Sequence, residues 1–380
     1  MKVLYDHQVF AWTRYAGIPR YFSELILALR NDATIHVTIP NFPTTSKDYL
    51  SLRGKEKMCL TYSSLLKCLN LSIDYFDKDF TRRVCYPIGK KESINLLKSN
   101  DYDVFHPTHY DPYFLKYSIN KPFVTTVHDL IVEKYPEYTL SGVNCTNVRL
   151  ISENATAIIA DSENTKKEFV EYYDIDSDKV TVVYLASSYS KEMVEVVLPP
   201  DNIITKDYLL FVNVRNGRKN FYTMVVSIAE LLCKYDIELI CVGGGKFSEE
   251  EITFFSKLGV ANRVKQRSVN NVELASLYKS AIALVFPSVD EGFGLPTLDA
   301  FACGCPVVLS NTSCHPEVGG DAAVYFSPKN LQSIREAVER VVSDEKLRNK
   351  MRERGYVQLK KFSWNKCAEE TKKVYERAME

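Results

Sequence analysis

The stretch DEGFGLPTLDAFACGCPVVLS, residues 290–310, places two carboxylates, Glu291 and Asp299, around a Gly-Phe-Gly-Leu-Pro turn and continues into an apolar run. Proline is favoured in the first turn of a helix, so the stretch predicts a loop, a helix that begins at Pro296, and a buried strand. A helix N-terminus carries free N–H groups and a partial positive charge, which suit a phosphate. The glycines of the turn have no Cβ and would let a ligand approach the backbone closely.

The two carboxylates would flank such a phosphate. Carboxylates accept strong hydrogen bonds, and sugar hydroxyls beside a phosphate could donate them to Glu291 and Asp299. A phosphate with a sugar on each side is a nucleotide sugar. The residues alone leave a second interpretation open, in which both carboxylates only stabilise the positive end of the helix.

The composition fits two globular domains. The 380 residues are 46% hydrophobic and 25% charged, and 48 Lys and Arg balance 48 Asp and Glu. A chain of this length can bury two cores, and its balanced charge indicates no nucleic-acid or anionic-lipid partner. Ten scattered cysteines suit a reducing compartment. We find no apolar run of about 18 residues and no signal peptide, and therefore expect a cytoplasmic protein.

Strand-like runs alternate with amphipathic helix-length runs along the whole chain, as in parallel sheets covered on both faces. Strands are predicted over residues 1–6, 35–40, 103–107, 123–129, 157–162, 180–185, 208–214, 237–245, 263–268, 283–288 and 306–310. Helices are predicted over 17–31, 220–234 and 248–258, and from Val272 and Pro296. A Pro-Pro pair within 189–207 indicates a linker. We predict an α/β fold of two doubly wound units, with ligands bound beyond the strand ends in the cleft between them.

Residues 287–328, PSVDEGFGLPTLDAFACGCPVVLSNTSCHPEVGGDAAVYFSP, resemble the signature of retaining GT-B glycosyltransferases of family 4. The usual form is Glu-Gly-Phe-Gly-Leu-Pro with a second Glu three residues after the Pro. Further stretches resemble the family in the right order: YAGIPRYFSELILAL, VTTVHDL, ADSENTKKEF, GRKNF and FSWNKCAEETKKVYERAM. The similarity therefore spans nearly the whole chain.

The resemblance implies a GT-B fold of two Rossmann-like domains that face a cleft. We expect an acceptor-side domain over residues 1–200 and a nucleotide-sugar-binding domain over 201–362. Residues 363–380 would form a C-terminal helix that crosses back to the first domain.

The resemblance also implies an activity. It is the transfer of a hexose, with retention of configuration, from a nucleotide sugar such as GDP-mannose or a UDP-hexose to a saccharide or lipid-linked saccharide acceptor. Surface polysaccharide synthesis is the expected setting, without a metal or other cofactor and without nucleic acid. Two alternatives stay open, namely an epimerase or hydrolase of the same fold and a catalytically silent protein that binds a nucleotide sugar.

Donor-binding roles carry over from the family position by position. Glu291 resembles the acid that contacts hydroxyls of the donor sugar, and the backbone N–H groups around Phe293, Gly294 and Leu295 would meet the sugar and the diphosphate. Asp299 takes the place of the Glu that binds the ribose diol. Asp is one methylene shorter, so the ribose would lie closer or be held more weakly.

Cations for the leaving diphosphate are expected in the turn RNGRKN, residues 215–220. Arg218 and Lys219 resemble the family's cationic pair, and Arg215 is a third candidate. Their charge would stabilise the diphosphate as its negative charge develops in the transition state. Taken alone, the turn is better interpreted as a solvated basic loop.

In the first half, His128 ends a predicted strand and resembles the family's histidine that touches the donor sugar. Gly17 would let the first loop approach the diphosphate, and Arg20 could face a phosphate or the acceptor. Ser162 and Glu317 are weaker candidates, since Ser162 is equally a helix cap and Glu317 could only brace a loop.

Two further features have simpler interpretations. Cys303, Cys305, Cys314 and His315 lie close in sequence, but their spacing is not that of a common zinc motif. Residues 64–100 mix basic and apolar side chains, which predicts either a peripheral membrane surface at the inner face of the membrane or an ordinary basic helix face.

Overall fold

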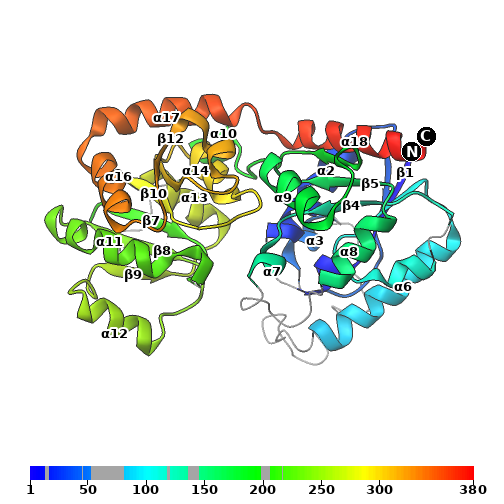
Figure 1. Ribbon diagram of the computed structural model, residues 1–380, viewed down its shortest axis with the longest axis horizontal. Helices are drawn as coiled ribbons and strands as arrows, with labels where there is room; N and C mark the ends of the chain where they lie inside the picture. Colours follow the sequence, from blue (N-terminus) through cyan, green and yellow to red (C-terminus); the bar gives the residue numbers. More distant parts are fainter. Residues whose placement is uncertain are drawn as a thin grey trace. The chain divides into compact units, whose positions relative to one another are not determined.

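The computed structural model describes residues 1–12, 17–44, 46–52, 81–117, 120–135, 145–197, 206–215 and 217–380. They form two compact units (Figure 1). The first consists of Met1–Leu185 and Trp364–Glu380, and the second of Ala186–Ser363. The last helix of the chain therefore belongs to the same unit as the first strand.

Strands and helices alternate in the first unit. Its strands are β1 (Lys2–Tyr5), β2 (His36–Thr38), β3 (Val104–His106), β4 (Val124–Val127), β5 (Ala157–Ala160) and β6 (Val180–Val182). Its α-helices are α1 (Gln8–Trp12), α2 (Gly17–Arg30), α3 (Lys47–Leu52), α6 (Tyr86–Ser99), α7 (Ile131–Lys134), α8 (Cys145–Asn154), α9 (Glu163–Tyr173) and α18 (Trp364–Met379). A π-helical turn, η2 (Thr81–Cys85), and two 3-10 turns, η3 (Pro112–Lys116) and η5 (Ser177–Lys179), complete it. Each strand predicted for this half is present, and α2 covers the predicted helix.

The strands of the first unit are parallel. They form two described sheets, in the orders β2-β1-β3 and β4-β5-β6, and a single bridge between Phe105 and Phe123 connects the two. Successive side chains of a strand point to opposite faces. Leu4 accordingly lies in the core that includes Phe169 of α9, while its neighbour Tyr5 packs edge-on against Phe22 of α2. Helices thus cover both faces, as the alternating sequence pattern predicted.

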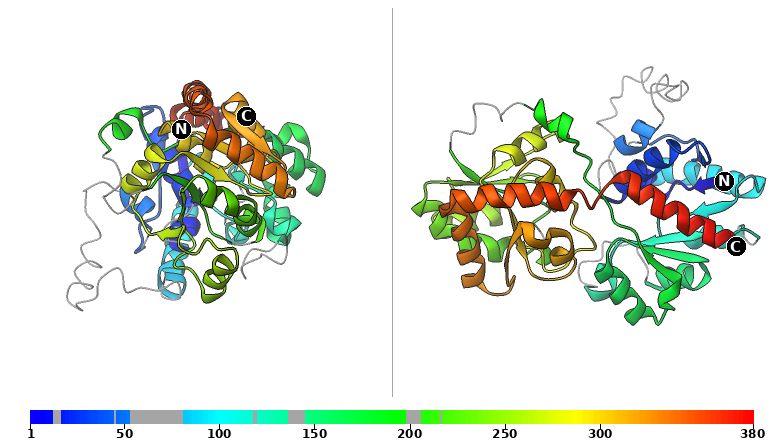
Figure 2. Two further views of the ribbon diagram at one scale, coloured as in Figure 1. Left: turned by 90° about the vertical axis from the view of Figure 1, so that its left-hand side faces the viewer. Right: turned by 90° about the horizontal axis from the view of Figure 1, so that it is seen from above.

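A buried polar chain attaches α18 to the first unit, beside α2 (Figure 2). Tyr375 OH lies 2.6 Å from Tyr5 OH and 2.7 Å from Nδ1 of His106, whose Nε2 lies 2.9 Å from Oγ1 of Thr126. Burial lowers the pKa of His106 to about 3, so its ring is neutral at physiological pH. Each polar atom of this chain has a partner, which compensates for the desolvation of these groups.

The second unit has the same alternation. Its strands are β7 (Tyr208–Val212), β8 (Glu238–Val242), β9 (Val264–Arg267), β10 (Ala283–Phe286), β11 (Val307–Ser310) and β12 (Ala323–Phe326). Its α-helices are α10 (Lys191–Glu195), α11 (Phe221–Lys234), α12 (Glu249–Lys257), α13 (Asn271–Ser280), α14 (Leu295–Ala302), α15 (His315–Gly319), α16 (Leu331–Ser343) and α17 (Glu345–Leu359). The 3-10 turns are η6 (Gly217–Lys219) and η7 (Gly320–Ala322). All the predicted strands are present. β12 was not predicted, because only Phe326 of this edge strand is fully buried and no alternation marks it.

One parallel sheet in the order β12-β11-β10-β7-β8-β9 forms the centre of the second unit. Leu209 and Phe211 face a core that includes Phe221 of α11. Tyr208 points the other way and donates its hydroxyl to the carbonyl O of Leu277 in α13 at 2.8 Å, so helices cover both faces. The strand order reverses between β7 and β10. Ligands of open α/β sheets bind at the carboxyl ends of strands that flank such a reversal.

The segment that follows β6 is part of the second unit. The division falls after Leu185, ahead of the boundary predicted after residue 200 from the Pro-Pro pair. Tyr189 OH donates to the carbonyl O of Asn271 at 3.0 Å, which fixes this segment to the start of α13. The sequence pattern gave no sign of this contact, because it is made by a single tyrosine in a stretch without periodicity.

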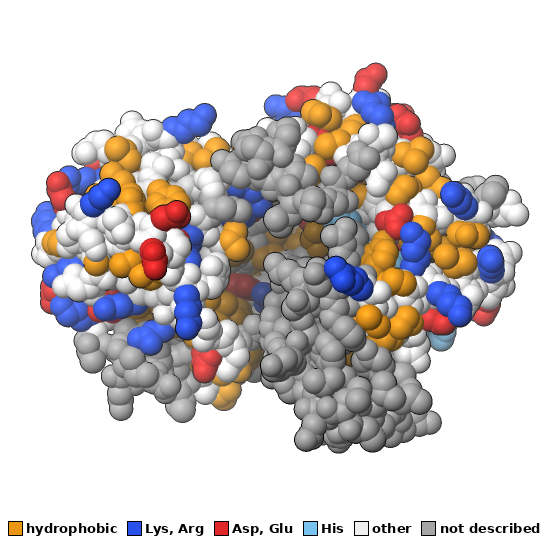
Figure 3. Space-filling view, turned by 90° about the horizontal axis from the view of Figure 1, so that it is seen from below, with side chains coloured by type: hydrophobic (Ala, Val, Ile, Leu, Met, Phe, Trp, Pro, Cys, Tyr) orange, Lys and Arg blue, Asp and Glu red, His pale blue; other side chains and the backbone are white. Residues whose placement is uncertain are grey.

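None of the described helices is long and apolar enough to cross a membrane. Acidic and basic side chains are interspersed on the described surface in Figure 3. Of the stretch 64–100, residues 64–80 lie outside the described residues. The remainder forms η2 and α6, where Lys90 Nζ pairs with Oδ2 of Asp111 at 2.8 Å.

Candidate active site

The loop between β10 and α14 lies at the point where the strand order reverses. Gly294 caps α14 with φ at +86°, a conformation that L-residues with side chains rarely adopt. Pro296 follows in the first turn, and the helix begins at Leu295, one residue before the predicted start. The fold therefore presents the N-terminus of α14, with the glycine turn before it, at the carboxyl edge of the sheet.

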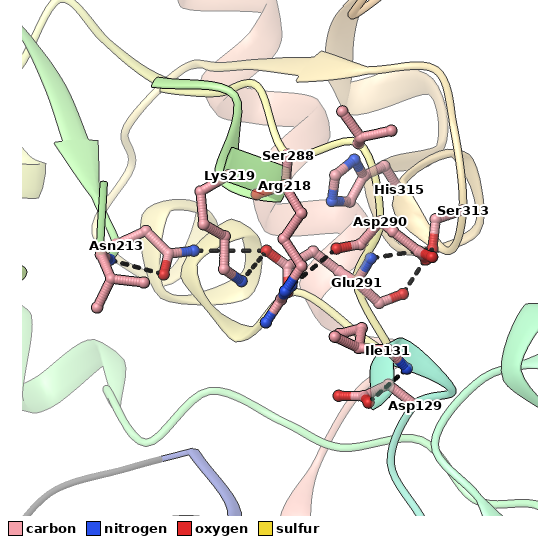
Figure 4. A network of polar contacts seen from close by, with 12 residues as sticks. Asp129, Ile131, Asn213, Arg218, Lys219, Ser288, Asp290, Glu291, Ser313 and His315 are labelled. Carbon is pink, nitrogen blue, oxygen red and sulfur yellow. Dashed lines mark hydrogen bonds and ion pairs between the residues drawn. The ribbon is translucent and has the colours of Figure 1, made fainter. Parts of the chain in front are cut away.

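An ion cluster, defined here as Arg218, Lys219 and Glu291, lies at the carboxyl ends of β7 and β10. Lys219 Nζ contacts Oε1 of Glu291 at 2.5 Å, and Nη1 of Arg218 is 3.5 Å from Oε2 (Figure 4). The side chains of Arg218, Lys219 and Glu291 are only 16%, 6% and 12% exposed. Asn213 adds a weaker contact, with Nδ2 at 3.4 Å from Oε1 of Glu291. The structure thus brings together three of the predicted catalytic residues.

The cluster keeps Glu291 ionised. Burial by itself would raise the pKa of the Glu291 carboxyl, but the charges of Lys219 and Arg218, with their hydrogen bonding, lower it to about 2. Two cations share this one carboxylate, which is surrounded by protein rather than bulk water. An additional anion beside these cations would be strongly stabilised, because charges interact more strongly where water is excluded.

Backbone and hydroxyl contacts hold the loops of the cluster in place. The N–H of Val289 donates to the carbonyl O of Arg218 at 2.9 Å. Ser313, after β11, has its hydroxyl 3.2 Å from the backbone N and 2.6 Å from the carbonyl O of Glu291. These hydrogen bonds therefore connect the loops after β7, β10 and β11. Sequence reasoning missed Asn213 and Ser313. Asn213 lies inside the predicted strand 208–214, and Ser313 follows shortly after the predicted strand 306–310.

His315 is completely buried behind the Glu291 loop. Its Nδ1 lies 2.5 Å from Oγ of Ser310, and burial lowers its pKa to about 4, so the ring is neutral. In the part of the chain that the structure describes, no group of three or more His, Cys, Asp or Glu residues is arranged to hold a metal ion. The cysteines near His315 in sequence are buried free thiols, which pack as small apolar residues.

Arg215 lies outside the ion cluster. Its guanidinium forms a two-point ion pair with Glu251, at 2.6 and 3.2 Å, and donates to the carbonyl O of Gly243 at 2.7 Å. It also stacks over the ring of Phe247, 4.8 Å from the centroid. All three nitrogens are engaged by internal acceptors, so Arg215 supports the glycine loop after β8 instead of offering a charge to a ligand.

The internal contacts of Arg215 predict that substituting this residue lowers the stability of the protein. We expect Arg215→Met to lower the free energy of unfolding by about 3–5 kcal/mol, because a buried carboxylate loses its partner. The measurement is urea unfolding followed by fluorescence. Arg263→Met, which breaks a pair with the 65% exposed Asp236, is the control and should cost under about 1 kcal/mol. Equal losses in the two variants would refute the structural role of Arg215.

Asp299, in α14, is 3% exposed. Its Oδ1 accepts a hydrogen bond from Oγ of Ser187 at 2.7 Å, and Ser187 in turn accepts from the N–H of Tyr189 at 3.0 Å. Asp299, which stands where the family has Glu, is therefore hydrogen-bonded to the segment that precedes α10. Sequence reasoning missed Ser187, because it lies in the segment assigned to the other domain.

In the first unit, His128 follows β4 and pairs through Nδ1 with Oδ2 of Asp161 at 2.7 Å. Burial would lower the pKa of His128, but the carboxylate of Asp161 outweighs burial and raises it. The register pairs Val127 with Ala160, so the next residue of each strand lies side by side. The two residues are distant in sequence, so only the register of the strands shows that they are neighbours.

The other candidate residues named from the sequence lie in helices or at the N-terminus of a helix. Gly17 begins α2, and a Cβ built on it meets nothing within 4 Å, while residues 13–16 of its loop lie outside the described residues. Arg20 lies in α2 and is partly buried. Ser162 caps α9 by accepting the N–H of Thr165 at 3.0 Å, which matches its structural interpretation. Glu317 lies in the short helix α15 and is partly buried.

Open parallel sheets with helices on both faces, and a glycine-capped helix N-terminus beside two buried cations at the strand reversal of the second unit, define a doubly wound α/β protein. Two family models match the sequence, Glycosyltransferase Family 4 over residues 15–186 and Glycosyl transferases group 1 over residues 200–358. The chain belongs to this glycosyltransferase family.

Known proteins are similar to this chain in sequence and in structure. The O-antigen chain mannosyltransferase B of Escherichia coli is 26% identical, with 99% of each chain covered. Sucrose-phosphate synthase from Thermosynechococcus elongatus has a TM-score of 0.70 at 17% identity, covering 99% of this chain and 98% of the other. HepE from Anabaena, in complex with UDP and glucose, has a TM-score of 0.69 at 16% identity, covering 98% of each chain. The predicted GT-B fold is confirmed by these structures.

Proposed function

We propose that this protein is a retaining hexosyltransferase that transfers mannose from GDP-mannose to a saccharide or lipid-linked saccharide acceptor. The observation that carries the proposal is the ion cluster of Arg218, Lys219 and Glu291 beside the N-terminus of α14. Mannose is chosen because the E. coli relative is a mannosyltransferase of O-antigen chains. A UDP-hexose is the second candidate, because the HepE structure contains UDP and glucose.

The cluster suggests how the donor is held. We propose that Arg218 and Lys219 bind the diphosphate and stabilise the negative charge that it gains as the glycosidic bond breaks. The N–H groups around Phe293, Gly294 and Leu295 would bind the same anion at the positive end of α14. These fixed cations would do the work of a metal ion, so we propose that the reaction requires none.

Two residues are proposed to contact the sugar being transferred. Glu291 would exchange part of its contact with the cations for hydrogen bonds from sugar hydroxyls, and His128 would accept or donate one further hydrogen bond. The acceptor hydroxyl would attack the face that the diphosphate leaves, and the departing phosphate would take its proton. Positioning and electrostatics would then account for most of the catalysis.

The proposal is tested by incubating the protein with GDP-mannose, UDP-glucose or UDP-galactose, a panel of synthetic mannosides and EDTA. We expect a mannosylated product from GDP-mannose, and proton NMR should identify an α-linkage, the configuration of the donor. Transfer from a UDP-hexose alone would contradict the choice of mannose. Donor breakdown without transfer would favour the hydrolase, and binding without any reaction would favour the silent homologue.

The fit of the ribose at Asp299 gives a separate prediction. We expect Asp299→Ala to weaken GDP binding about tenfold to a hundredfold, because hydrogen bonds to a charged carboxylate are lost. Ser187→Ala is the matched control: it removes only the neutral donor to Asp299 and should cost about fivefold. The measurement is calorimetric titration of GDP. Unchanged affinity in Asp299→Ala would remove this residue from the proposed site.

A further inference from the structure

A buried imidazole–carboxylate pair lies at the carboxyl ends of β4 and β5. The side chains of His128 and Asp161 are 10% and 4% exposed, and their joined atoms, Nδ1 and Oδ2, are 2.7 Å apart. His128 Nε2 is also buried and has no hydrogen-bond partner among the described residues. One nitrogen of the ring is therefore fixed by protein, and the other is left for a different group.

Aromatic side chains enclose the imidazole. The rings of Tyr21 and Phe22 stand edge-on to it, with centroids 5.2 and 6.0 Å from the centroid of His128. The hydroxyl of Tyr21 lies 3.3 Å from Oγ1 of Thr126. The ring of His128 is thus confined by packing on α2, and Asp161 supplies its only hydrogen bond within the described residues.

The chemistry of a buried carboxylate determines which nitrogen carries the proton. An ionised Asp only accepts hydrogen bonds, so the nitrogen that faces it must carry the hydrogen. When the imidazole is neutral, that hydrogen is on Nδ1 and the lone pair is on Nε2. In water a free histidine is not held in this tautomer by any partner. Asp161 therefore selects the form of the ring.

We propose that Asp161 is a positioning residue, which accepts a hydrogen bond from Nδ1–H of His128 and so leaves Nε2 to form a hydrogen bond with a hydroxyl of the donor sugar. Asp161 itself touches no substrate in this proposal. The inference rests on the proposed function, in which His128 contacts the donor sugar. A similar division of labour, with a buried carboxylate orienting a histidine, is well established in hydrolases.

The first experiment measures the tautomer and does not depend on activity. Protein labelled with 15N-histidine is examined by two-bond 1H–15N correlation above the pKa of the ring, with His128→Gln used to assign the signals. We expect the wild-type His128 to carry its hydrogen on Nδ1. Asp129→Asn, which removes the charge of an adjacent carboxylate but not the contact to Nδ1, should keep that tautomer. A hydrogen on Nε2 in the wild-type protein would overturn the proposal.

The second experiment measures kinetics in Asp161→Asn, which keeps the shape of the side chain and removes its charge. We expect kcat to fall about tenfold to a hundredfold, the range for one lost charge-assisted hydrogen bond, with the KM for the donor changed less than about threefold. Asp161→Glu should recover part of the loss. Unchanged kcat in a folded Asp161→Asn protein would overturn the proposal. If His128→Gln retains full activity while the Nδ1–H tautomer is observed, the proposed role of His128 fails but the pairing with Asp161 stands.

Discussion

Replacing Glu291 by Gln should lower kcat by about a hundredfold to a thousandfold, the loss typical of removing one group that stabilises charge in a transition state. Glu291 pairs with two buried cations, and its pKa of about 2 keeps it ionised at any physiological pH. Glutamine keeps the length and one acceptor oxygen but not the charge. Both the hydrogen bonds to the sugar and the placement of the cations would therefore change.

The matched control for Glu291→Gln is Glu339→Gln. Glu339 also pairs with a lysine, Lys234, at 2.6 Å, but the two side chains are 29% and 58% exposed. We expect this change to leave steady-state turnover within about a factor of two, since exposed pairs contribute little. Similar kcat values for Glu291→Gln and Glu339→Gln would exclude Glu291 from the catalytic site.

Replacing Lys219 by Met should reduce kcat by a similar factor of about a hundred to a thousand, because the leaving diphosphate would lose one of two fixed cations. Lys219 is 5% exposed, so bulk water cannot replace its charge. Arg218 remains to pair with Glu291, which should preserve the fold. Single-turnover assays with saturating donor would separate the chemical step from binding.

Lys234→Met serves as the control for Lys219→Met, because it removes a lysine of the exposed pair in the same unit. The double variant Glu291→Gln with Lys219→Met should lose much less activity than the product of the two single losses, because the side chains act as one unit. Strictly multiplicative losses would mean that the two residues work independently, contrary to the structure.

The fold was predictable from the sequence to a large extent. Apolar runs such as Tyr208–Val212 become buried central strands, and the Gly-Leu-Pro signal gave the start of α14 to within one residue. The compact units divide after Leu185, ahead of the Pro-Pro pair. Proline pairs mark breaks in regular structure, but they do not report which core a segment packs on, and Tyr189 packs on the second.

The residues of the ion cluster were named from the family resemblance, and the structure brings their three side chains into contact. Arg215 shows where spacing fails. Arg215 lies close to Lys219 in sequence. Its guanidinium nevertheless forms an ion pair with Glu251 of α12 and not with the ion cluster. Asp161 and Ser187 were missed because their partners, His128 and Asp299, are distant in sequence. Only the register of the strands and the packing of the segment after β6 bring each pair together.

The central claim, that the ion cluster binds the diphosphate of a nucleotide sugar, is tested most directly by thermal unfolding without metal, with GDP-mannose, UDP-glucose, GDP or UDP. A ligand at about 100 times its Kd stabilises a protein by about 2.7 kcal/mol. We predict a clear rise in Tm with GDP-mannose, smaller rises with UDP-glucose and UDP, and loss of most of the GDP-mannose effect in Lys219→Met but not in Lys234→Met. An unchanged Tm with every nucleotide in the folded wild-type protein, or an equal rise in Lys219→Met, would contradict the claim.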